Sequence, residues 1–320
     1  MQNQRQVYGQ TLVELGREND RIAVLEADLG KSTMSCLFQA EFPDRYFEMG
    51  IAEANMVSFA AGLSLTDRIA FVNTFAVFAT GRPYDQIRQG VCIGNLNVKI
   101  VGSSAGLSDF GDGATHQSIE DIALMRAIPN MTVLVPCDGR ETAQAVRAAA
   151  AHDGPVYLRI CRNDVEDVLP EGTPFEIGMP RVLREGHDIV LFATGIMVST
   201  ALKAARSLEA EGIHARVVNI STIKPLNAQR IVELAQDCCA VLVAEEHTGI
   251  GGLTAAVLDA LRTTPVPVES VSIGDRFGQS AESHEELLAR YGLTVEDMCR
   301  KARALVHQFK KAVQPADLFG

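Results

Sequence analysis

The sequence lacks the features that tie a protein to nucleic acid or to a membrane. Its 29 Lys and Arg stand against 40 Asp and Glu, which gives a net charge of −11, and no basic stripe is present. This balance argues against nucleic acid or an anionic membrane as the main partner. No apolar run approaches the ~20 residues that a membrane span needs, and the first residues lack the apolar core of a signal peptide.

Tryptophan is absent, and cysteine shows no metal-binding pattern. The 7 cysteines are scattered and odd in number, without any C-x-x-C spacing. Such a pattern is typical of reduced thiols in the cytoplasm and argues against a structural zinc site. We therefore expect a cytoplasmic protein that binds no metal through its own side chains.

Hydrophobic runs alternate with helical periods along most of the chain. With 320 residues, 47% of them hydrophobic, the chain can bury a large core and is expected to form two domains. Buried strands are predicted at 22–27, 69–73, 97–102, 132–136, 156–160, 188–193, 215–219 and 240–245. Helices are predicted at 6–18, 55–65, 76–88, 119–126, 139–151, 197–211, 227–236, 252–261, 282–291 and 294–308. This alternation predicts an α/β fold with mainly parallel sheets covered by helices.

The middle of the chain contains the expected domain boundary. Residues 163–187 are rich in Glu, Pro, Gly and Asp and show no sustained period. Such a segment predicts a linker, with or without a hairpin. We place the first domain at 1–180 and the second at 186–310, with a loose tail at 311–320.

One carboxylate stands out in residues 47–56, Phe-Glu-Met-Gly-Ile-Ala-Glu-Ala-Asn-Met. Glu53 lies at the junction between a strand-like segment and a helix, and Gly50 permits the turn between them. If the carboxylate is buried, its pKa rises and it becomes suited to proton exchange. The alternative is a glutamate in the first turn of a helix, favoured there by the helix dipole. The stretch alone leaves both interpretations open.

A long polar loop follows the predicted strand 97–102. It contains Asp109, Asp112, Thr115 and His116. Ligands of open α/β sheets bind beyond the carboxyl ends of the strands, where this loop is expected to lie. An imidazole beside a carboxylate suits sugar hydroxyls or proton transfer, whereas Thr115 could equally cap the next helix.

Two phenylalanines follow the predicted strand 69–73. Phe75 and Phe78 are three residues apart and share one face of a helix. Such a pair can hold a flat ring by stacking, although the same spacing is also common in a core.

The triplet Gly111-Asp112-Gly113 is similar to the start of a Mg-diphosphate motif. That motif needs an Asn pair some tens of residues later to supply oxygen ligands for Mg²⁺. Here Asn130 stands alone. The sequence therefore predicts that Mg²⁺ is not bound by this chain.

Four blocks together resemble the C-terminal half of transketolase: FEMGIAEANM, NTFAVFATGRPYDQIR, DGATHQSIEDIALMRAIPNM and DGPVYLRICR. The resemblance covers residues 5–308. It implies a pyrimidine-binding domain and a C-terminal domain, without the diphosphate-binding domain. It further implies the second subunit of a split transketolase, which shares thiamine diphosphate with a partner subunit that holds Mg²⁺, in a heterotetramer. The implied reaction moves a two-carbon ketol unit from a ketose phosphate to an aldose phosphate.

The resemblance also implies roles for residues near the cofactor. Glu53 matches the glutamate that hydrogen-bonds the pyrimidine ring nitrogen and favours the tautomer that deprotonates the thiazolium. Phe75 and Phe78 match the aromatic wall around the pyrimidine, and Tyr84 is the candidate for a third aromatic. Asp28 matches an aspartate near the cofactor.

Other positions match residues that contact the substrate. Ser32 matches a serine at the donor phosphate, and Arg5 and Arg162 match arginines that grip the sugar phosphate, a task suited to the guanidinium fork. Asp112 and His116 match the pair that contacts donor hydroxyls.

The loop departs from the family pattern in one respect. The family has a phosphate-binding histidine shortly before it, where this chain has Ser104 or, if the loop is longer, Gly102. Asp109 and Phe110 are interpreted as an insertion. Both differences argue against the usual pentose and hexose phosphates, and they leave open an acceptor with a different charged tail or a less common sugar.

Three other functions stay open on the sequence. The beta subunit of a 2-oxoacid dehydrogenase has the same two domains and an equivalent glutamate. A deoxyxylulose-phosphate synthase fragment and a catalytically idle regulatory paralogue are the others. The segment from Asp112 to His116 and the run DIALMRAIPNM favour transketolase.

Overall fold

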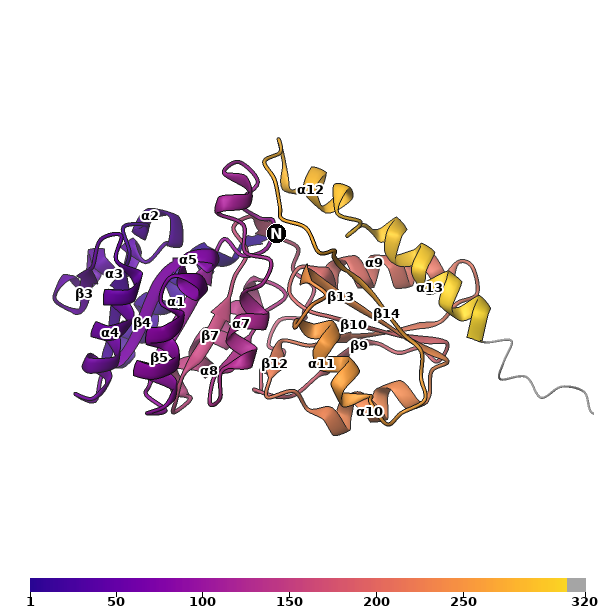
Figure 1. Ribbon diagram of the computed structural model, residues 1–320, viewed down its shortest axis with the longest axis horizontal. Helices are drawn as coiled ribbons and strands as arrows, with labels where there is room; N and C mark the ends of the chain where they lie inside the picture. The colour runs from indigo at the N-terminus through magenta and orange to yellow at the C-terminus, as the bar shows by residue number, and fades with distance from the viewer. Residues whose placement is uncertain (310–320) are drawn as a thin grey trace, which may run out of the picture.

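The structure, a computed structural model, describes residues 1–309. Figure 1 shows two lobes, each built on a β-sheet with helices packed against it. The predicted α/β architecture with two mainly parallel sheets is confirmed. The predicted tail at 311–320 lies outside the described residues. Within 1–309, no helix is long and apolar enough to cross a membrane.

The first lobe contains a seven-stranded sheet in the order β12-β6-β7-β5-β4-β2-β3. Its strands are β2 (Ile22–Glu26), β3 (Tyr46–Glu48), β4 (Ile69–Phe75), β5 (Val98–Ser103), β6 (Thr132–Leu134), β7 (Val156–Arg159) and β12 (Thr222–Lys224). Neighbouring strands are parallel except for β12, which pairs antiparallel with β6 at one edge.

Both faces of this sheet are buried. Val24 and Phe71 face one hydrophobic cluster, and the adjacent Leu25 and Val72 face another, because successive strand residues point to opposite sides. The first cluster is covered by α1 (Gln4–Glu18), α3 (Cys36–Glu41) and α8 (Gly139–Ala151). The second is covered by α4 (Glu53–Ser64), α5 (Ala76–Gly81), α6 (Tyr84–Gln86), a π-helical turn (Ile87–Cys92) and α7 (Asp121–Ala127). Burial on both sides accounts for the nearly continuous hydrophobic strands.

The second lobe contains a five-stranded sheet in the order β14-β13-β10-β11-β9. Its strands are β9 (Arg181–Arg184), β10 (Ile189–Ala193), β11 (Ala215–Asn219), β13 (Ala240–Thr248) and β14 (Val268–Ile273), and only β9 is antiparallel to its neighbour. One face packs on α9 (Met197–Glu209), α12 (His284–Arg290) and α13 (Val295–Phe309). The other packs on α10 (Ala228–Gln236) and α11 (Leu253–Ala260), and its cluster continues into the first lobe.

A two-stranded ribbon ties the start of the chain to the end of the first sheet. β1 (Gln2–Asn3) pairs antiparallel with β8 (Asp164–Val165), and the Asn3 side chain donates to the Arg162 carbonyl at 3.1 Å. The Cys161 amide donates to the Gln4 side chain at 2.8 Å. These bonds bring the first turn of α1 close to the carboxyl end of β7.

The sequence did not predict β12, β14 or α3. β12 is only three residues long. It belongs to the second half of the chain in sequence, but it pairs with β6 of the first sheet. The division at 180 and 186 therefore stays a prediction. β14 is an edge strand in which only Val271 and Ile273 are buried, so it lacks the hydrophobic run that marked the other strands.

A buried ion pair lies at the junction of the two lobes. Arg159, at the end of β7, contacts the Asp121 carboxylate at 2.8 Å and also donates to the Glu246 carbonyl at 2.9 Å. The Tyr157 hydroxyl donates to Asp121 at 2.6 Å. Since Glu246 belongs to β13, this guanidinium links the first sheet, the start of α7 and the second sheet.

Replacing Arg159 with Met should destabilise the protein strongly. Asp121 would be left charged and unpaired in the interior, which costs about 3–5 kcal/mol. Urea unfolding followed by circular dichroism measures the change. The control is Arg300→Met, which breaks an exposed pair with Asp297 and should cost less than about 1 kcal/mol. Equal losses in the two variants would contradict this assignment.

Candidate active site

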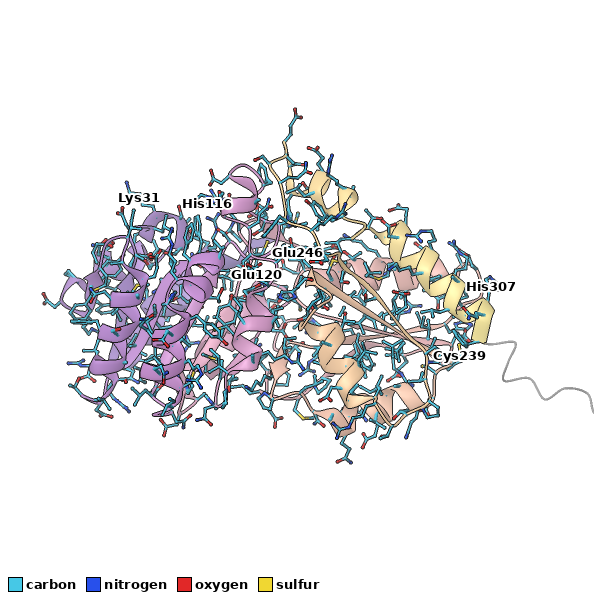
Figure 2. All side chains as sticks on the ribbon, viewed as in Figure 1. Lys31, His116, Glu120, Cys239, Glu246 and His307 are labelled. Carbon is cyan, nitrogen blue, oxygen red and sulfur yellow. The ribbon has the colours of Figure 1, made fainter. Side chains whose placement is uncertain are left out.

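Most of the predicted site residues lie at one edge of the first sheet. Ser32 follows β2, Phe75 ends β4, His116 lies in the loop after β5, and Arg162 follows β7. These strands are parallel, so their carboxyl ends meet at the same edge. Figure 2 shows His116 at the upper edge of the first lobe, with Lys31 of α2 (Gly30–Thr33) along the same edge.

Glu53 is the first residue of α4 and is buried, with 4% of its surface exposed. Gly50, at a φ of 66°, makes the turn that leads from β3 into the helix. The Arg82 guanidinium donates to Glu53 Oε1 at 2.5 Å and lies over the Phe78 ring, 4.1 Å from its centroid. No hydrogen bond from residues 1–309 reaches Oε2. The carboxylate is therefore fixed at one oxygen and available at the other.

Two phenyl rings and one imidazole form the wall beside this carboxylate. The Phe75 and Phe78 rings have centroids 6.1 Å apart and an interplanar angle of 16°. The His116 ring meets both edge-on, at 6.2 Å from Phe75 and 5.2 Å from Phe78. Phe75 is buried and Phe78 is half-buried, so the pair forms part of the surface of the site. Such nearly parallel rings suit contact with another flat ring.

The structure does not bring Tyr84 into this group. Tyr84 lies in α6 and packs against the hydrophobic cluster beneath α4. No ring contact within 1–309 links it to Phe75 or Phe78. Its predicted role as a third aromatic therefore has no geometric support.

The loop after β5 carries two interacting carboxylates. The Arg162 guanidinium donates to the buried Asp109 carboxylate at 3.1 Å. Burial raises the pKa of Asp109; Arg162 opposes this shift, and the neighbouring Asp112 adds to it. His116 lowers the pKa of Asp109, and its Nδ1 contacts the Thr115 hydroxyl at 2.9 Å. The predicted Asp112 and His116 pair thus faces the same group, Asp109.

Arg5 and Arg162 lie close enough for each charge to affect the other. Burial lowers the pKa of Arg5, and the charge on Arg162 lowers it further. Arg5 Nη1 donates to the Ser32 carbonyl at 2.8 Å, whereas its buried Nε has no partner among residues 1–309. Arg162 also lies over the Phe75 ring, 5.7 Å from its centroid. The structure thus brings the predicted substrate arginines and Ser32 together.

Asp28 lies in the turn between β2 and α2. Its side chain is exposed, its φ is 61°, and its amide donates to the Glu48 carboxylate at 2.9 Å. Beneath the turn, the buried Glu26 accepts from the Thr33 and Ser35 hydroxyls, each at 2.6 Å. Burial raises the pKa of Glu26 to about 7, against the opposing effect of these hydroxyls.

The second lobe holds the loop after β5 in place. The Glu246 carboxylate of β13 accepts from the Leu107 amide at 2.9 Å and contacts His284 at 2.7 Å. The Ala281 amide donates to the Phe110 carbonyl at 2.9 Å. The segment before α12 therefore packs on the loop that carries Asp109 and His116.

Sequence reasoning missed three parts of this site. Arg82 was not singled out, although it lies four residues after Phe78 and so on the same helix face. Asp109 was noticed only as a member of the loop. The Glu246 and His284 pair has no local signal, because the two residues are 38 positions apart. Within 1–309, no group of three or more His, Cys, Asp or Glu is placed to hold a metal ion.

Two known domain families match the chain. Residues 1–167 match the pyrimidine binding domain of transketolase, and residues 178–298 match the transketolase C-terminal domain. The chain belongs to the transketolase family. The resemblance to the C-terminal half of that enzyme is thereby confirmed.

Individual relatives agree with this family. The 6-deoxy-6-sulfo-D-fructose transketolase subunit SqwH of a Clostridium species is 38% identical over 305 residues, covering 95% of this chain and 94% of that one. The 1-deoxy-D-xylulose-5-phosphate synthase of Symbiobacterium thermophilum is 37% identical over 322 residues, covering 97% of this chain but 48% of that enzyme. A solved structure described as a split gene transketolase, inactive beta4 tetramer, is 46% identical with a TM-score of 0.87, covering 96% of this chain and 99% of that one.

Glu26 should make stability depend on pH. Its folded pKa of about 7 lies above the ordinary value of 4.5, so the folded state keeps a proton that the unfolded state loses. The stability that this proton contributes is fully present below pH 4.5 and is lost as the pH rises through 7. Urea midpoints at pH 5, 6, 7 and 8 should show this fall in the wild type but much less of it in Glu26→Gln. Parallel curves for the wild type and Glu26→Gln would contradict the assignment, and the exposed Glu171→Gln should follow the wild type.

Proposed function

We propose that this chain is the pyrimidine-binding subunit of a thiamine-diphosphate-dependent transketolase. The reaction moves a two-carbon ketol unit from a ketose or ketose phosphate to an aldose or aldose phosphate. The observation that carries the proposal is the buried Glu53 carboxylate, available at Oε2, beside the Phe75 and Phe78 rings. His116 and Arg162 border the same wall.

The residues present fit the pyrimidine half of the cofactor. Phe75 and Phe78 offer an apolar wall for a flat aminopyrimidine, and Glu53 Oε2 offers a carboxyl oxygen that would share a proton with the ring nitrogen at its edge. When bound, thiamine diphosphate supplies the carbon nucleophile and electron sink for breaking the bond next to a ketone. Asp28 at the end of β2 is the remaining candidate for a contact with it.

The chain itself holds and orients the reacting groups. Arg82 fixes Glu53 Oε1, so that the second oxygen keeps one orientation for a hydrogen bond with a ring nitrogen. The phenyl rings exclude water from that bond and so strengthen it. His116 Nδ1 is engaged with Thr115, which leaves Nε2 for a substrate hydroxyl, with Asp112 as a second acceptor.

The proposal includes a partner subunit that carries the diphosphate and Mg²⁺ site. Its support is the absence of an Asn pair after Gly111-Asp112-Gly113 and the relative that is itself named a subunit. Assembly into a heterotetramer with shared sites is part of the same proposal. A cytoplasmic location is supported by the scattered cysteines, odd in number and without C-x-x-C spacing, a pattern typical of reduced thiols.

The direct test is an assay of the chain with and without a diphosphate-binding partner from the same genome. We expect no transfer by the chain alone and ketol transfer by the mixture, measured with a panel of ketose donors and aldose acceptors. Turnover by the purified chain alone would contradict the shared site. Pyruvate decarboxylation with an artificial electron acceptor would indicate a 2-oxoacid dehydrogenase, and condensation of pyruvate with an aldose phosphate would indicate a deoxyxylulose-phosphate synthase. A mixture without any turnover would favour a regulatory subunit.

Glu53→Gln should lower kcat of the assembled enzyme by about 100-fold or more, the scale of a lost proton-transfer group. The amide keeps the shape of the side chain but cannot act as the acidic partner of a ring nitrogen. Steady-state kinetics measure the loss, and circular dichroism checks the fold. Glu18→Gln, a surface carboxylate paired with Arg147, is the control. Wild-type rates in Glu53→Gln would remove Glu53 from the mechanism.

A further inference from the structure

The far end of the site contains two arginines whose charges are already offset. Arg162 contacts Asp109, which is 2% exposed, at 3.1 Å. Arg5 lies near Arg162, and its charge is influenced by Asp109 and by Asp164. With Asp112 beside Asp109, two arginines and three carboxylates share this end, so the carboxylates offset both guanidinium charges.

A phosphate ester would bind weakly at this cluster of arginines and carboxylates. A phosphate monoester carries a charge of about −1.5 to −2 at pH 7. Tight binding in a partly buried site needs matching positive charge, and Asp109 would repel the ester as well as occupy one nitrogen of the Arg162 fork. The exposed Lys31 lies along the same edge (Figure 2), but no hydrogen bond or ion pair among residues 1–309 joins it to the cluster.

A single negative charge fits the donors that remain. Arg5 Nε is buried without a partner within 1–309. Ser104, which with Gly102 is a candidate for the position where the family resemblance expects a phosphate-binding histidine, is fully buried, and its hydroxyl also lacks a partner in that range. One guanidinium nitrogen and one neutral hydroxyl can serve a weakly charged oxygen group without the full compensation that a dianion requires.

We propose that the substrate tail bound here carries at most one negative charge, as a sulfonate does, and that Asp109 sets this preference over phosphate. The assignment rests on the proposed transketolase function, because it identifies this end of the site as the place of the substrate tail. Asp109 acts by keeping Arg162 neutralised. A tail with one charge then pairs with Arg5 and leaves the Arg162 and Asp109 pair intact.

A binding experiment tests the proposal on the chain itself, without turnover. Inorganic phosphate and methanesulfonate are titrated into the purified chain at pH 8, where phosphate is a dianion, and arginine Nε–H signals are followed by NMR. The wild type should bind methanesulfonate at least as tightly as phosphate. Asp109→Asn should bind phosphate at least tenfold more tightly than the wild type, with at most a twofold gain for methanesulfonate. Asp44→Asn, an exposed aspartate outside the cluster, should change neither affinity.

A kinetic experiment on the assembled enzyme separates this proposal from the proposed function. The kcat/KM for a ketose with a terminal sulfonate should exceed that for the matching phosphate at least tenfold, and Asp109→Asn should shift this ratio at least tenfold toward phosphate. Ketol transfer that prefers phosphate in the wild type would overturn the tail assignment while leaving the transketolase function standing. Equal phosphate affinity in the wild type and Asp109→Asn would overturn it as well. If Asp109→Asn fails to fold, the wild-type affinities for methanesulfonate and phosphate still test the proposal, and tighter binding of phosphate would overturn it.

Discussion

The buried contact between Arg159 and Asp121 is the interaction on which the rest of the structure depends. Arg159 is the last residue of β7, one of the parallel strands whose carboxyl ends meet at the site. Asp121 is the first residue of α7, shortly after the polar loop. The same guanidinium reaches the Glu246 carbonyl in the second sheet. Glu246 in turn holds the Leu107 amide near the start of the loop. One internal charge pair thus couples the two lobes to the position of the loop that carries Asp109 and His116.

The candidate site built on this frame combines three features. It has a carboxylate with one oxygen that accepts no hydrogen bond within 1–309, an aromatic wall, and a polar end whose arginines face carboxylates. Nothing in the described residues gathers the oxygen ligands that a divalent cation prefers. The apolar wall is open on one side, and Arg82 fixes Glu53 on the other. This arrangement fits the proposed site, in which a second subunit would supply the remaining residues.

The sequence predicted those features whose signal is local. Strands buried on both faces appear as short hydrophobic runs, and the edge of a parallel sheet gathers the residues that follow each run, so Phe75 and His116 could be expected near one another. Ser32 and Arg162 were named only through the family resemblance. The strands β12 and β14 could not be predicted, because a three-residue edge pairing and a half-exposed strand leave no hydrophobic period. The contact of Asp109 with Arg162 joins residues 53 positions apart. The displacement of Tyr84 likewise depends on tertiary packing, which propensity and spacing do not contain.

The central claim is that Glu53 engages a cofactor whose other half lies in another subunit. The most direct measurement is a crystal structure of the chain assembled with its diphosphate-binding partner and thiamine diphosphate. The account predicts Glu53 Oε2 within about 2.6–3.2 Å of a pyrimidine ring nitrogen, with that ring against Phe75 or Phe78. A cofactor bound away from this edge, with Glu53 engaged by Arg82 alone, would contradict it.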